Sequence, residues 1–580
     1  MINISLKLNT LHKPFLFFLF LILHNTLYAQ FAPKNYPQNY FVYPVEARIS
    51  LAANFGELRP NHYHMGLDCR TNQVTNRPVN AAAAGYIARV SIAPFGFGRA
   101  IYINHPNGLT TLYGHLNDFY PALEKYIKSR QYQLQSWNID IEIPSDLFPV
   151  KKGQFIAYSG NTGGSQGPHC HFEIRDTKTD KVLNPLLFGL PIPDKVPPTI
   201  VRLAMYDRTK STYSQSPKLF SLKKINGKYT TTQGIISVGQ KTSFGISAND
   251  KQSGSTNPNG IFSAVIYLDG QPLSGFQLDS ISYDETRYLN AHIDYRTRAA
   301  GGPYIEHLSR LPGYPEGVYK DFQNDGVIEL EDNDVHDVQI IVKDANANTS
   351  LLQFKIQRSS IAEADKIPAS YFEQKEFHPG FVNVFENENL QLYLTPMTLY
   401  DSVAFSYSEK TSVAPNLYSN VHSVLSGLIP AHDNFVIRIK TNKPVEENVA
   451  DKMLVKRTWK EKTEVIKAEK DGDWYSAKFR AFGNFELIAD NQPPVIAASF
   501  HENANLSGAS GIIITPRDNN NELKNFRAEL DGKWLRFTND KGRSFIYYFD
   551  EMCARGKHEL KISVEDEAGN MTEKIYHFTR

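Results

Sequence analysis

Two histidines, His169 and His171, stand two positions apart in the apolar run "GPHCHFEIR". In a β-strand, residues i and i+2 point to the same face, so the two imidazoles are expected to lie side by side. Two imidazoles facing one site can bind a metal or move a proton. A lone His-x-His pair also occurs by chance in ordinary strands, so it does not identify a site by itself.

A second set of polar groups, in "NHYHMGLDCR" (61–70), changes this interpretation. His64 and Asp68 are four apart, which places them on one face of a helix or a strand, and Gly66 with the surrounding pattern favours the strand. Catalytic zinc takes three protein ligands from His and Asp or Glu and keeps a position for water. His64, Asp68 and one histidine of the later pair form such a set. His62 is a rival ligand, because it shares a strand face with His64.

A further histidine, His115, ends the apolar strand in "TLYGHLND". Considered alone, a histidine at a strand end that bonds a backbone carbonyl is the more common structural interpretation. Its meaning changes when it is taken together with the two motifs above.

The three motifs together resemble peptidase family M23, the lysostaphin-like zinc metallopeptidases of peptidoglycan. The family pattern is His-x-x-x-Asp, then Tyr-x-His, then a glycine-rich turn leading into His-x-His. It stands here as "HMGLD", "YGH" and "GNTGGSQGPHCHFEIRD", in that order. The connecting segments "PVNAAAAGYIARV", "GFGRAIYINHPNG" and "VKKGQFIAYSGNTG" are also similar. The resemblance covers roughly residues 45–190, about a quarter of the chain.

Carried over position by position, the resemblance implies that one Zn²⁺ is bound by His64, Asp68 and His171. It implies that His115 and His169 are the catalytic histidines, which orient or deprotonate water and stabilise the tetrahedral intermediate. His62 then becomes a residue at the rim of the site. The implied fold is an antiparallel β-sheet peptidase domain, and the implied substrate is the peptide stem or cross-bridge of peptidoglycan.

Two features depart from the family pattern. Cys170 stands between the paired histidines, where the family usually has an aliphatic residue. The segment between "YGHL" and "VKKG" is an insertion, about 118–149, in which Pro121 precedes a helix-competent stretch, as expected for proline in a first helical turn. We expect this insertion to form part of a groove wall that restricts access or sets specificity.

The two cysteines beside the motifs share a predicted position. If Asp68 and His171 lie opposite each other on antiparallel strands, Cys69 faces Cys170 on the reverse side of the sheet, away from the metal. This register predicts a cross-strand disulfide or a close pair of thiols, and the alternative is two independent buried cysteines packed as small apolar residues.

The first 29 residues are typical of a secretory signal. Lys7 and Lys13 precede the apolar run "PFLFFLFLIL", and a small residue, Ala29, precedes Gln30. The run is shorter than the roughly 20 residues that span a bilayer. We therefore expect cleavage after residue 29, no integral membrane segment in the mature chain, and a location in the periplasm, the cell envelope or outside the cell.

The composition and patterning predict a mainly β chain of several domains. After the signal peptide (1–29) we expect an M23-like domain (30–194), an immunoglobulin-like β-sandwich (195–360), a β-rich middle domain (361–489) and a second immunoglobulin-like β-sandwich (490–580). The two sandwiches form a divergent internal repeat, since "DKVPPTIVRLAMYD" resembles "DNQPPVIAASFHE" and "DVQIIVKDANANTSLLQFKI" resembles "HELKISVEDEAGNMTEKIYHF". Their acidic turns, 344–348 and 566–570, suggest calcium, although such turns are more often only turns.

The formal net charge is +1 and the basic residues form no long block, which argues against a nucleic-acid partner. The favoured function is a zinc endopeptidase of peptidoglycan whose C-terminal β-modules contact envelope proteins. One alternative is a non-catalytic scaffold that regulates another cell-wall hydrolase, which loss of ligands would favour. The other is an adhesion protein that works through its β-sandwiches.

Overall fold

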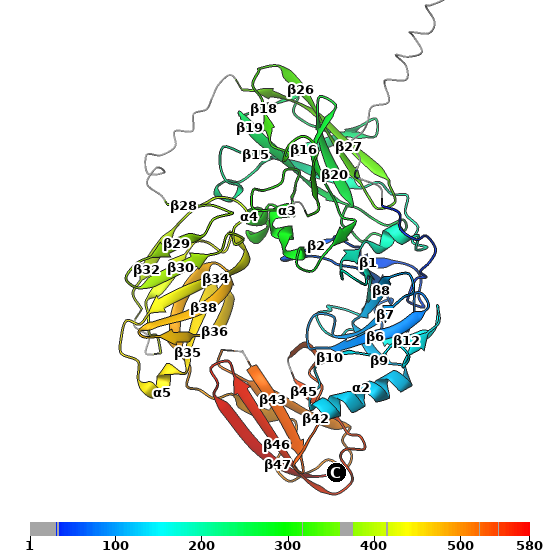
Figure 1. Cartoon of the computed structure of the whole chain (residues 1–580), viewed down its shortest axis with the longest axis vertical. Helices are drawn as coiled ribbons and strands as arrows, with labels where there is room; N and C mark the ends of the chain where they lie inside the picture. Colours follow the sequence, from blue (N-terminus) through cyan, green and yellow to red (C-terminus); the bar gives the residue numbers. More distant parts are fainter. Residues whose placement is uncertain are drawn as a thin grey trace, which may run out of the picture.

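The structure is a computed structural model that describes residue 31 and residues 34–315, 317–359, 375–412, 416–520, 523–542 and 544–580. The signal segment predicted at 1–29 lies outside these residues. Most regular elements are β-strands, which form four groups arranged in a closed loop, with the C-terminal strands beside the N-terminal group (Figure 1). In the part of the chain that is described, no helix is long and apolar enough to cross a membrane.

An antiparallel sheet in the N-terminal group carries the histidine motifs. Its strands follow the order β1-β4-β13-β8-β7-β6-β10. Their bounds are β1 Leu51–Ala53, β4 Leu67–Arg70, β6 Gly85–Ile92, β7 Arg99–Asn104, β8 Leu109–Gly114, β10 Ile139–Glu142 and β13 His169–Asp176. A smaller sheet of β5 (Pro78–Asn80), β12 (Phe155–Ser159) and β9 (Leu116–Phe119) shares one hydrophobic core with it.

Strand alternation separates the site face of this sheet from its core face. On β13, Cys170, Phe172 and Ile174 lie in the core, so His169 and His171 project from the opposite face. The predicted register is confirmed, because β13 pairs with β4 so that His171 lies opposite Asp68 and Cys170 opposite Cys69.

The insertion folds partly as predicted. Helix α2 (Pro121–Leu134) begins at Pro121 and ends at Gln135, whose φ of 49° closes the helix. The rest of the insertion is not helical: β10 and β11 (Pro149–Val150) both pair with β6 and extend the main sheet at its edge. The sequence pattern did not reveal these edge strands.

The second group lies between residues 195 and 359. Ten of its strands form one connected path, β23-β19-β15-β16-β17-β27-β26-β20-β21-β24. Beside this path, β18 (Ile235–Val238) pairs with β27 and β25 (Ile328–Glu329) with β19. The bounds are β15 Thr199–Asp207, β16 Lys218–Ile225, β17 Lys228–Thr231, β19 Lys241–Asn249, β20 Ser263–Leu268, β21 Gln271–Gln277, β23 Glu306–His307, β24 Tyr319–Asp321, β26 Val335–Lys343 and β27 Thr349–Arg358. The immunoglobulin-like fold expected for this segment stays a prediction.

The third group contains two five-stranded sheets and a short pair, β28 (Glu376–Phe377) with β31 (Val403–Ala404). Their orders are β29-β30-β34-β38-β37 and β32-β33-β39-β35-β36. The bounds are β29 Asn383–Glu386, β30 Leu390–Leu394, β32 Tyr407–Lys410, β33 Val421–Val424, β34 Pro430–Lys440, β35 Met453–Trp459, β36 Lys462–Lys467, β37 Glu469–Asp471, β38 Trp474–Ala481 and β39 Gly483–Ala489. The charged stretch before β35 contains a single helical turn, α5 (Glu447–Ala450).

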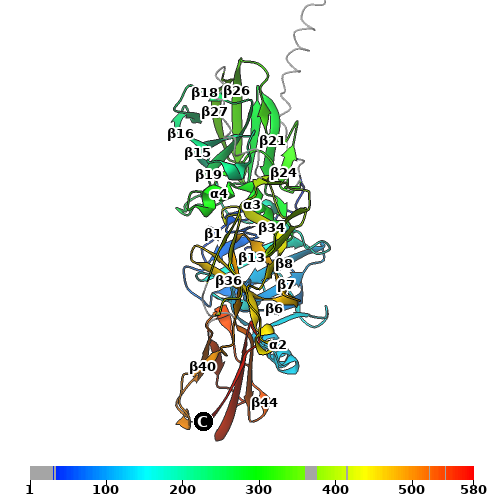
Figure 2. The same ribbon diagram turned by 90° about the vertical axis from the view of Figure 1, so that its left-hand side faces the viewer.

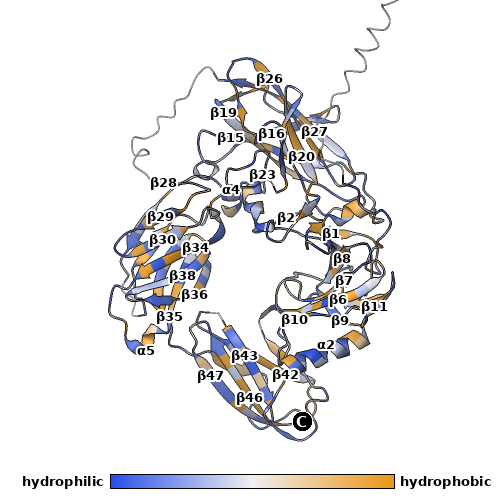
Figure 3. Cartoon of the chain, viewed as in Figure 1, coloured by the Kyte–Doolittle hydropathy of each residue, from blue (hydrophilic) through white to orange (hydrophobic). Residues whose placement is uncertain are grey.

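The last group also has two sheets, β40-β42-β45 and β41-β47-β46-β43-β44. The bounds are β40 Val495–Ala498, β41 Ala504–Asn505, β42 Gly511–Arg517, β43 Leu523–Leu530, β44 Lys533–Trp534, β45 Phe545–Tyr548, β46 Lys557–Asp566 and β47 Met571–Thr579. Hydrophobic and hydrophilic residues alternate along many of these strands (Figure 3), and on β46 Leu560, Ile562 and Val564 are buried between more exposed neighbours.

Contacts between the groups close the loop. β14 (Val182–Leu183) of the first group pairs with β22 (Ser280–Ile281) of the second. Helix α2 lies at the same end of the molecule as β40 and β44 (Figure 2), and Nζ of Lys128 on this helix contacts Asp550 at 2.8 Å. The predicted insertion thus connects the first group to the last.

Candidate metal centre

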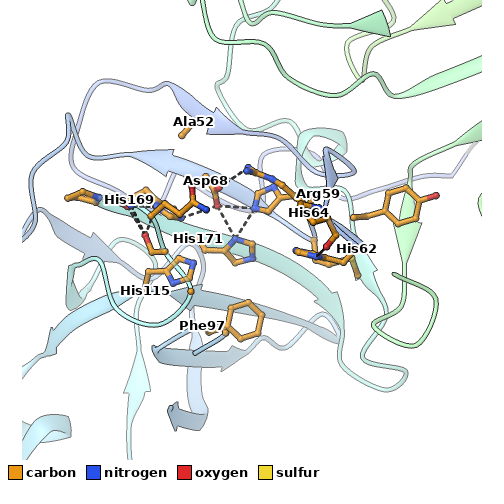
Figure 4. A pocket seen from close by; sticks show the side chains of 18 of the residues that line it. Ala52, Arg59, His62, His64, Asp68, Phe97, His115, His169 and His171 are labelled. Carbon is orange, nitrogen blue, oxygen red and sulfur yellow. Dashed lines mark hydrogen bonds and ion pairs between the residues drawn. The ribbon is translucent and has the colours of Figure 1, made fainter. Parts of the chain in front are cut away.

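A groove of about 1020 Å³ opens on the site face of the N-terminal sheet. All five predicted site residues line it, as Figure 4 shows, although they come from three separate stretches of the chain. His64 and Asp68 lie just before and within β4, His115 follows β8, and His169 and His171 begin β13. The structure therefore brings together the residues that the three motifs predict.

Three of these residues point their ligand atoms at one position. Nε2 of His64 lies 2.9 Å from Oδ1 of Asp68 and 3.1 Å from Nδ1 of His171, and this Nδ1 lies 3.0 Å from the same carboxylate oxygen. Bonds of about 2.0–2.1 Å to a tetrahedral zinc ion separate two ligand atoms by about 3.3 Å. The three atoms are thus nearly as far apart as zinc requires, and the two imidazoles and one carboxylate are ligands that zinc accepts.

Neighbouring acceptors fix which nitrogen of each of the two histidines faces this position. Nδ1 of His64 donates to the carbonyl of Asn54 at 2.7 Å, and Nε2 of His171 donates to Oε1 of Glu173 at 2.9 Å. The remaining nitrogens, Nε2 of His64 and Nδ1 of His171, therefore face Oδ1 of Asp68. A second hydrogen bond of this kind is typical of histidines that bind a metal.

His115 and His169 stand beside the three residues and are oriented in the same way. Nδ1 of His115 donates to the carbonyl of Thr162 at 2.8 Å, and Nδ1 of His169 donates to the carbonyl of Gly167 at 2.8 Å. Their ring centroids are 4.7 Å apart, and Nε2 of His169 lies 3.3 Å from Oδ1 of Asp68. In each ring Nδ1 is thus held by a backbone carbonyl, and Nε2 is the other nitrogen that an imidazole can use in proton transfer.

The backbone and the surroundings of His115 are unusual. Its φ is 58°, in the left-handed region that residues with a side chain seldom occupy. Burial, together with the nearby His169 and His171, lowers the pKa of His115 to about 3, so its imidazole is neutral at neutral pH. Such outliers persist where the surrounding structure over-determines them, as at functional sites.

Asp68 is the electrostatic centre of the cluster. Burial opposes its ionisation, but the imidazoles of His64, His169 and His171 outweigh burial and hold the pKa of Asp68 well below its usual range. Arg59 adds a positive charge 3.7 Å from its Oδ2. The carboxylate is therefore charged, as a metal ligand must be.

Sequence reasoning missed several residues that shape the site. Glu173 has a recognisable signal, because it lies two residues after His171 and so on the same strand face. Its partner Arg175 follows the same rule, with Nε donating to Oε2 of Glu173 at 2.7 Å. No sequence pattern predicts Tyr283 or Phe97 at the site. Tyr283 reaches the groove from the second group, and the ring centroid of Phe97 lies 5.4 Å from that of His171.

Two other expectations, on His62 and on the insertion, have different outcomes. His62 lies exposed at the rim, with Nδ1 bonded to the carbonyl of Pro60 at 2.9 Å, and is outside the ligand cluster as expected. The expectation that the insertion 118–149 forms a groove wall is wrong, because among the described residues none of this segment lines the groove. Its helix packs against the C-terminal group instead, with Nη1 of Arg536 donating to Gln131 at 3.1 Å.

The cysteines form the thiol pair rather than the disulfide. Cys69 and Cys170 face each other across β4 and β13 on the core side and are fully buried, but both are free. Burial raises the pKa of Cys69 to about 12 and that of Cys170 well above its usual value. They pack as small apolar residues behind the site.

Comparisons with known proteins agree with the geometry. Residues 62–132 match the family model "Peptidase family M23", and residues 374–490 match "Zu5-like domain". An uncharacterised metalloprotease of Haemophilus influenzae is 31% identical over 158 residues, 26% of this chain and 27% of the relative. The DD-carboxypeptidase/endopeptidase Mpg of Neisseria meningitidis serogroup B is 33% identical over 131 residues, 23% of this chain and 24% of the relative.

The matched region therefore spans about a quarter of the length of these curated relatives. Among solved structures, the catalytic domain of lysostaphin from Staphylococcus simulans has 23% sequence identity and a TM-score of 0.18, over 23% of this chain and 88% of that one. The motifs, the buried ligand cluster and the family match agree: the N-terminal group contains a peptidase family M23 domain, of which residues 62–132 match the family model.

Proposed function

We propose that the chain is a zinc endopeptidase that hydrolyses peptide bonds in the stems or cross-bridges of peptidoglycan. The observation that carries this proposal is the convergence of His64, Asp68 and His171 on one position in an open groove, with two further histidines, His115 and His169, beside it. The printed name of the Neisseria relative, a DD-carboxypeptidase/endopeptidase, supports the choice of substrate class.

In this proposal His64, Asp68 and His171 hold one Zn²⁺. When bound, zinc supplies a Lewis acid that polarises a carbonyl and acidifies water. The hydrogen bonds to Asn54 and Glu173 keep both imidazoles in the tautomer that can ligate. Glu173 remains charged although it is buried, because Arg175 and His171 lower its pKa.

His115 and His169 are the proposed catalytic residues. Each holds a proton on Nδ1 through a backbone carbonyl and presents Nε2 to the groove, so each is able to take a proton from water and later to donate it to the leaving amine. An imidazolium formed this way also faces the charged Asp68, which stabilises it. The two side chains thus provide the acid and base work of amide hydrolysis.

We also propose that the mature chain starts at residue 30, is exported, and consists of four units, 30–194, 195–360, 361–489 and 490–580. The four groups of sheets and the Zu5-like match at 374–490 support this division. Envelope proteins are the proposed partners of the β units. The regulator and adhesion alternatives predict that the same protein does not release peptides from the cell wall.

The test incubates purified residues 30–580 with isolated peptidoglycan sacculi and identifies the released muropeptides. We expect cleavage that a chelator abolishes and zinc restores, and that His171→Ala removes. The matched control is His62→Ala, which changes an imidazole at the rim of the same groove and should keep activity. Wild-type protein that releases nothing, or a fully active His171→Ala variant, would overturn the proposal.

A further inference from the structure

Two acidic clusters lie far from the peptidase site, at equivalent positions of the internal repeat. The first consists of Asp194, Asp250 and Asp344, and the second of Asp490, Asp518 and Asp566. In each cluster, ligand oxygens of the three carboxylates lie within 4.8 Å of one another. Each cluster joins the segment before the Pro-Pro opening of its repeat to the ends of two strands, β19 and β26 in the first and β42 and β46 in the second.

The same hydrogen bonds build both clusters. The side-chain amide of Asn348 donates to Oδ2 of Asp344 at 2.6 Å and to the carbonyl of Asp194 at 3.4 Å. The equivalent amide of Asn570 donates to Oδ2 of Asp566 and to the carbonyl of Asp490, both at 2.8 Å. The turns at 344 and 566 thus belong to the same hydrogen-bonded motif, which occurs once in each repeat.

In each cluster, one carboxylate has a buried oxygen that accepts no hydrogen bond from the described residues. Oδ1 of Asp250 and Oδ1 of Asp518 are buried, and within the described residues neither has a hydrogen-bond partner. The Asp250 side chain is the clearer case, because the residue is only 5% exposed. None of the six aspartates forms an ion pair with a basic residue of the described chain. A buried carboxylate without a partner is destabilising unless a cation compensates it.

The pKa shifts in both clusters agree with a site for a cation. Burial, with Asp194 and Asp344 adding to it, raises the pKa of Asp250 to about 7. Burial also raises the pKa of Asp344 and, in the second cluster, of Asp518. A bound cation removes the mutual repulsion that causes part of these shifts.

The first cluster encloses a space of suitable size. Asp194, Asp250 and Asp344 line a cavity of about 20 Å³, room for one water molecule or one ion. The other polar residues around it are amides, Asn54, Gln252, Asn259 and Asn346, and no histidine or cysteine takes part. Oxygen donors without nitrogen or sulfur select a hard cation, and irregular sets with several carboxylates suit Ca²⁺ better than the strict octahedron of Mg²⁺.

We propose that each acidic cluster binds one Ca²⁺, at the start of each repeated β unit. Leu51 and Ile192 of the preceding group also line the first cavity, so the ion lies at the junction between two groups. At the second cluster, Lys452 and Lys467 of the third group donate to the carbonyls of Gly569 and Ala568 at 2.7 and 2.5 Å. Calcium therefore stabilises the two junctions and with them the closed arrangement of the chain.

The test measures calcium binding to residues 30–580 by isothermal titration in metal-depleted buffer, with the zinc site filled. We expect two equivalents of Ca²⁺ for the wild type, one each for Asp250→Asn and Asp518→Asn, and none for the double variant. The matched control is Asp334→Asn, an exposed carboxylate of the second group, which should keep both. No calcium binding by the wild type, or two equivalents in the Asp250→Asn variant, would overturn the proposal.

Thermal unfolding separates a binding defect from a folding defect. Without calcium, Asp250→Asn should raise the melting temperature, because it removes a buried unpaired charge. With saturating calcium the wild type should gain about 5 °C and the variant less. A variant that melts lower than the wild type without calcium would show that Asp250 has only a structural role.

A second, independent observation concerns the contact that closes the loop. The turn Asp540–Gly542 of the last group touches the glycine-rich loop that precedes β13. Oδ1 of Asp540 accepts from the amide of Gly163 at 2.8 Å, and Nζ of Lys541 donates to the carbonyls of Gly163 and Ser165 at 3.2 and 2.5 Å. Two hydrogen-bonding side chains from the C-terminal unit thus hold a loop of the peptidase groove.

This loop also holds both proposed catalytic histidines, since the carbonyl of Thr162 orients His115 and that of Gly167 orients His169. We infer that Lys541 is a positioning residue for the peptidase, an inference that rests on the proposed function. The C-terminal unit then stabilises the conformation of this loop of the groove. Separation of the unit from the groove would loosen the loop and lower the turnover rate.

The test compares Lys541→Met, Lys541→Arg and the control Lys533→Met in the same unit. We expect Lys541→Met to lower kcat by about 10- to 100-fold with unchanged zinc content and melting temperature, and Lys541→Arg to restore part of the activity. Wild-type kcat in Lys541→Met would overturn this inference while leaving the proposed function intact. An inactive wild type would instead contradict the proposed function.

Discussion

The phenol of Tyr283 donates a hydrogen bond of 2.5 Å to Oε1 of Glu173, and the same oxygen accepts one of 2.9 Å from Nε2 of His171. Tyr283, which lies 110 positions from Glu173 in the sequence and belongs to the second group, is therefore only one side chain away from a proposed zinc ligand. Its ring also lines the groove. The second group completes the surroundings of the peptidase site in addition to extending the chain.

Replacement of Tyr283 by phenylalanine should weaken the site without unfolding it. The change removes one of the donors that hold the Glu173 carboxylate, and partners of metal-binding histidines typically contribute 10- to 100-fold. We expect kcat/KM on peptidoglycan fragments to fall about tenfold, with an unchanged melting temperature. Tyr158→Phe, which changes an exposed tyrosine of the N-terminal group, is the control. Equal kcat/KM in the Tyr283→Phe and wild-type enzymes would show that the contact has no catalytic effect.

Substitution of the five site residues should divide them into two classes. We expect His64→Ala to lose both zinc and activity, because it removes a ligand atom. His115→Ala should keep about one zinc per chain and still lose at least 100-fold in kcat, because only an acid-base group is removed. Metal analysis and initial rates on the same samples check both expectations. Loss of zinc from His115→Ala would place this histidine among the ligands.

The sequence predicts the site better than it predicts the surroundings of the site. Strand periodicity places His64 with Asp68, and His169 with His171, on common strand faces, whereas their separate roles come from the family resemblance. The observed register between Asp68 and His171 also places Cys69 opposite Cys170. These relations lie within one strand or one pair of strands, so the spacing of residues along the sequence predicts them.

Contacts between distant segments have no such signal. The fold brings distant segments of the chain into contact, and hydrophobic periodicity does not predict such contacts. The contacts of Tyr283, Lys541 and the insertion helix are of this kind. The acidic clusters lie between these cases: the turns at 344 and 566 are visible in the repeat, but Asp250 and Asp518 join them only in the fold.

The three cysteines should be protected thiols. Cys69, Cys170 and Cys553 are free and buried, and burial raises the pKa of Cys553 to about 11, so none carries the reactive thiolate at neutral pH. We expect iodoacetamide to label none in the native protein and all three after unfolding without a reductant, as measured by mass spectrometry. A Cys69–Cys170 cross-linked peptide in the unreduced sample would contradict this.

His307 should make the second group sensitive to acid. The residue is 1% exposed and its Nδ1 has no partner among the described residues. Burial, assisted by the positive charge of Arg208 and by His292, lowers its pKa from an ordinary value near 6.5 to about 3. Because the folded pKa is the lower one, the native state binds fewer protons than the unfolded state between these values. The contribution of the neutral His307 imidazole to the free energy of unfolding is therefore fully present above about pH 6.5 and is lost as the pH falls toward 3.

Replacement of His307 by phenylalanine should remove this dependence. The aromatic ring keeps the contact with Tyr206, whose ring centroid lies 4.8 Å from that of His307, but has no proton to gain. Between pH 6.5 and 4 the wild type should lose up to about 1.4 kcal/mol more stability per pH unit than the variant. Urea unfolding at several pH values measures this difference in the free energy of unfolding. The contributions of other buried histidines cancel in the difference, because both proteins contain them. Parallel curves for the two proteins would mean that His307 is already protonated in the native state or that acid opens another part of the chain first.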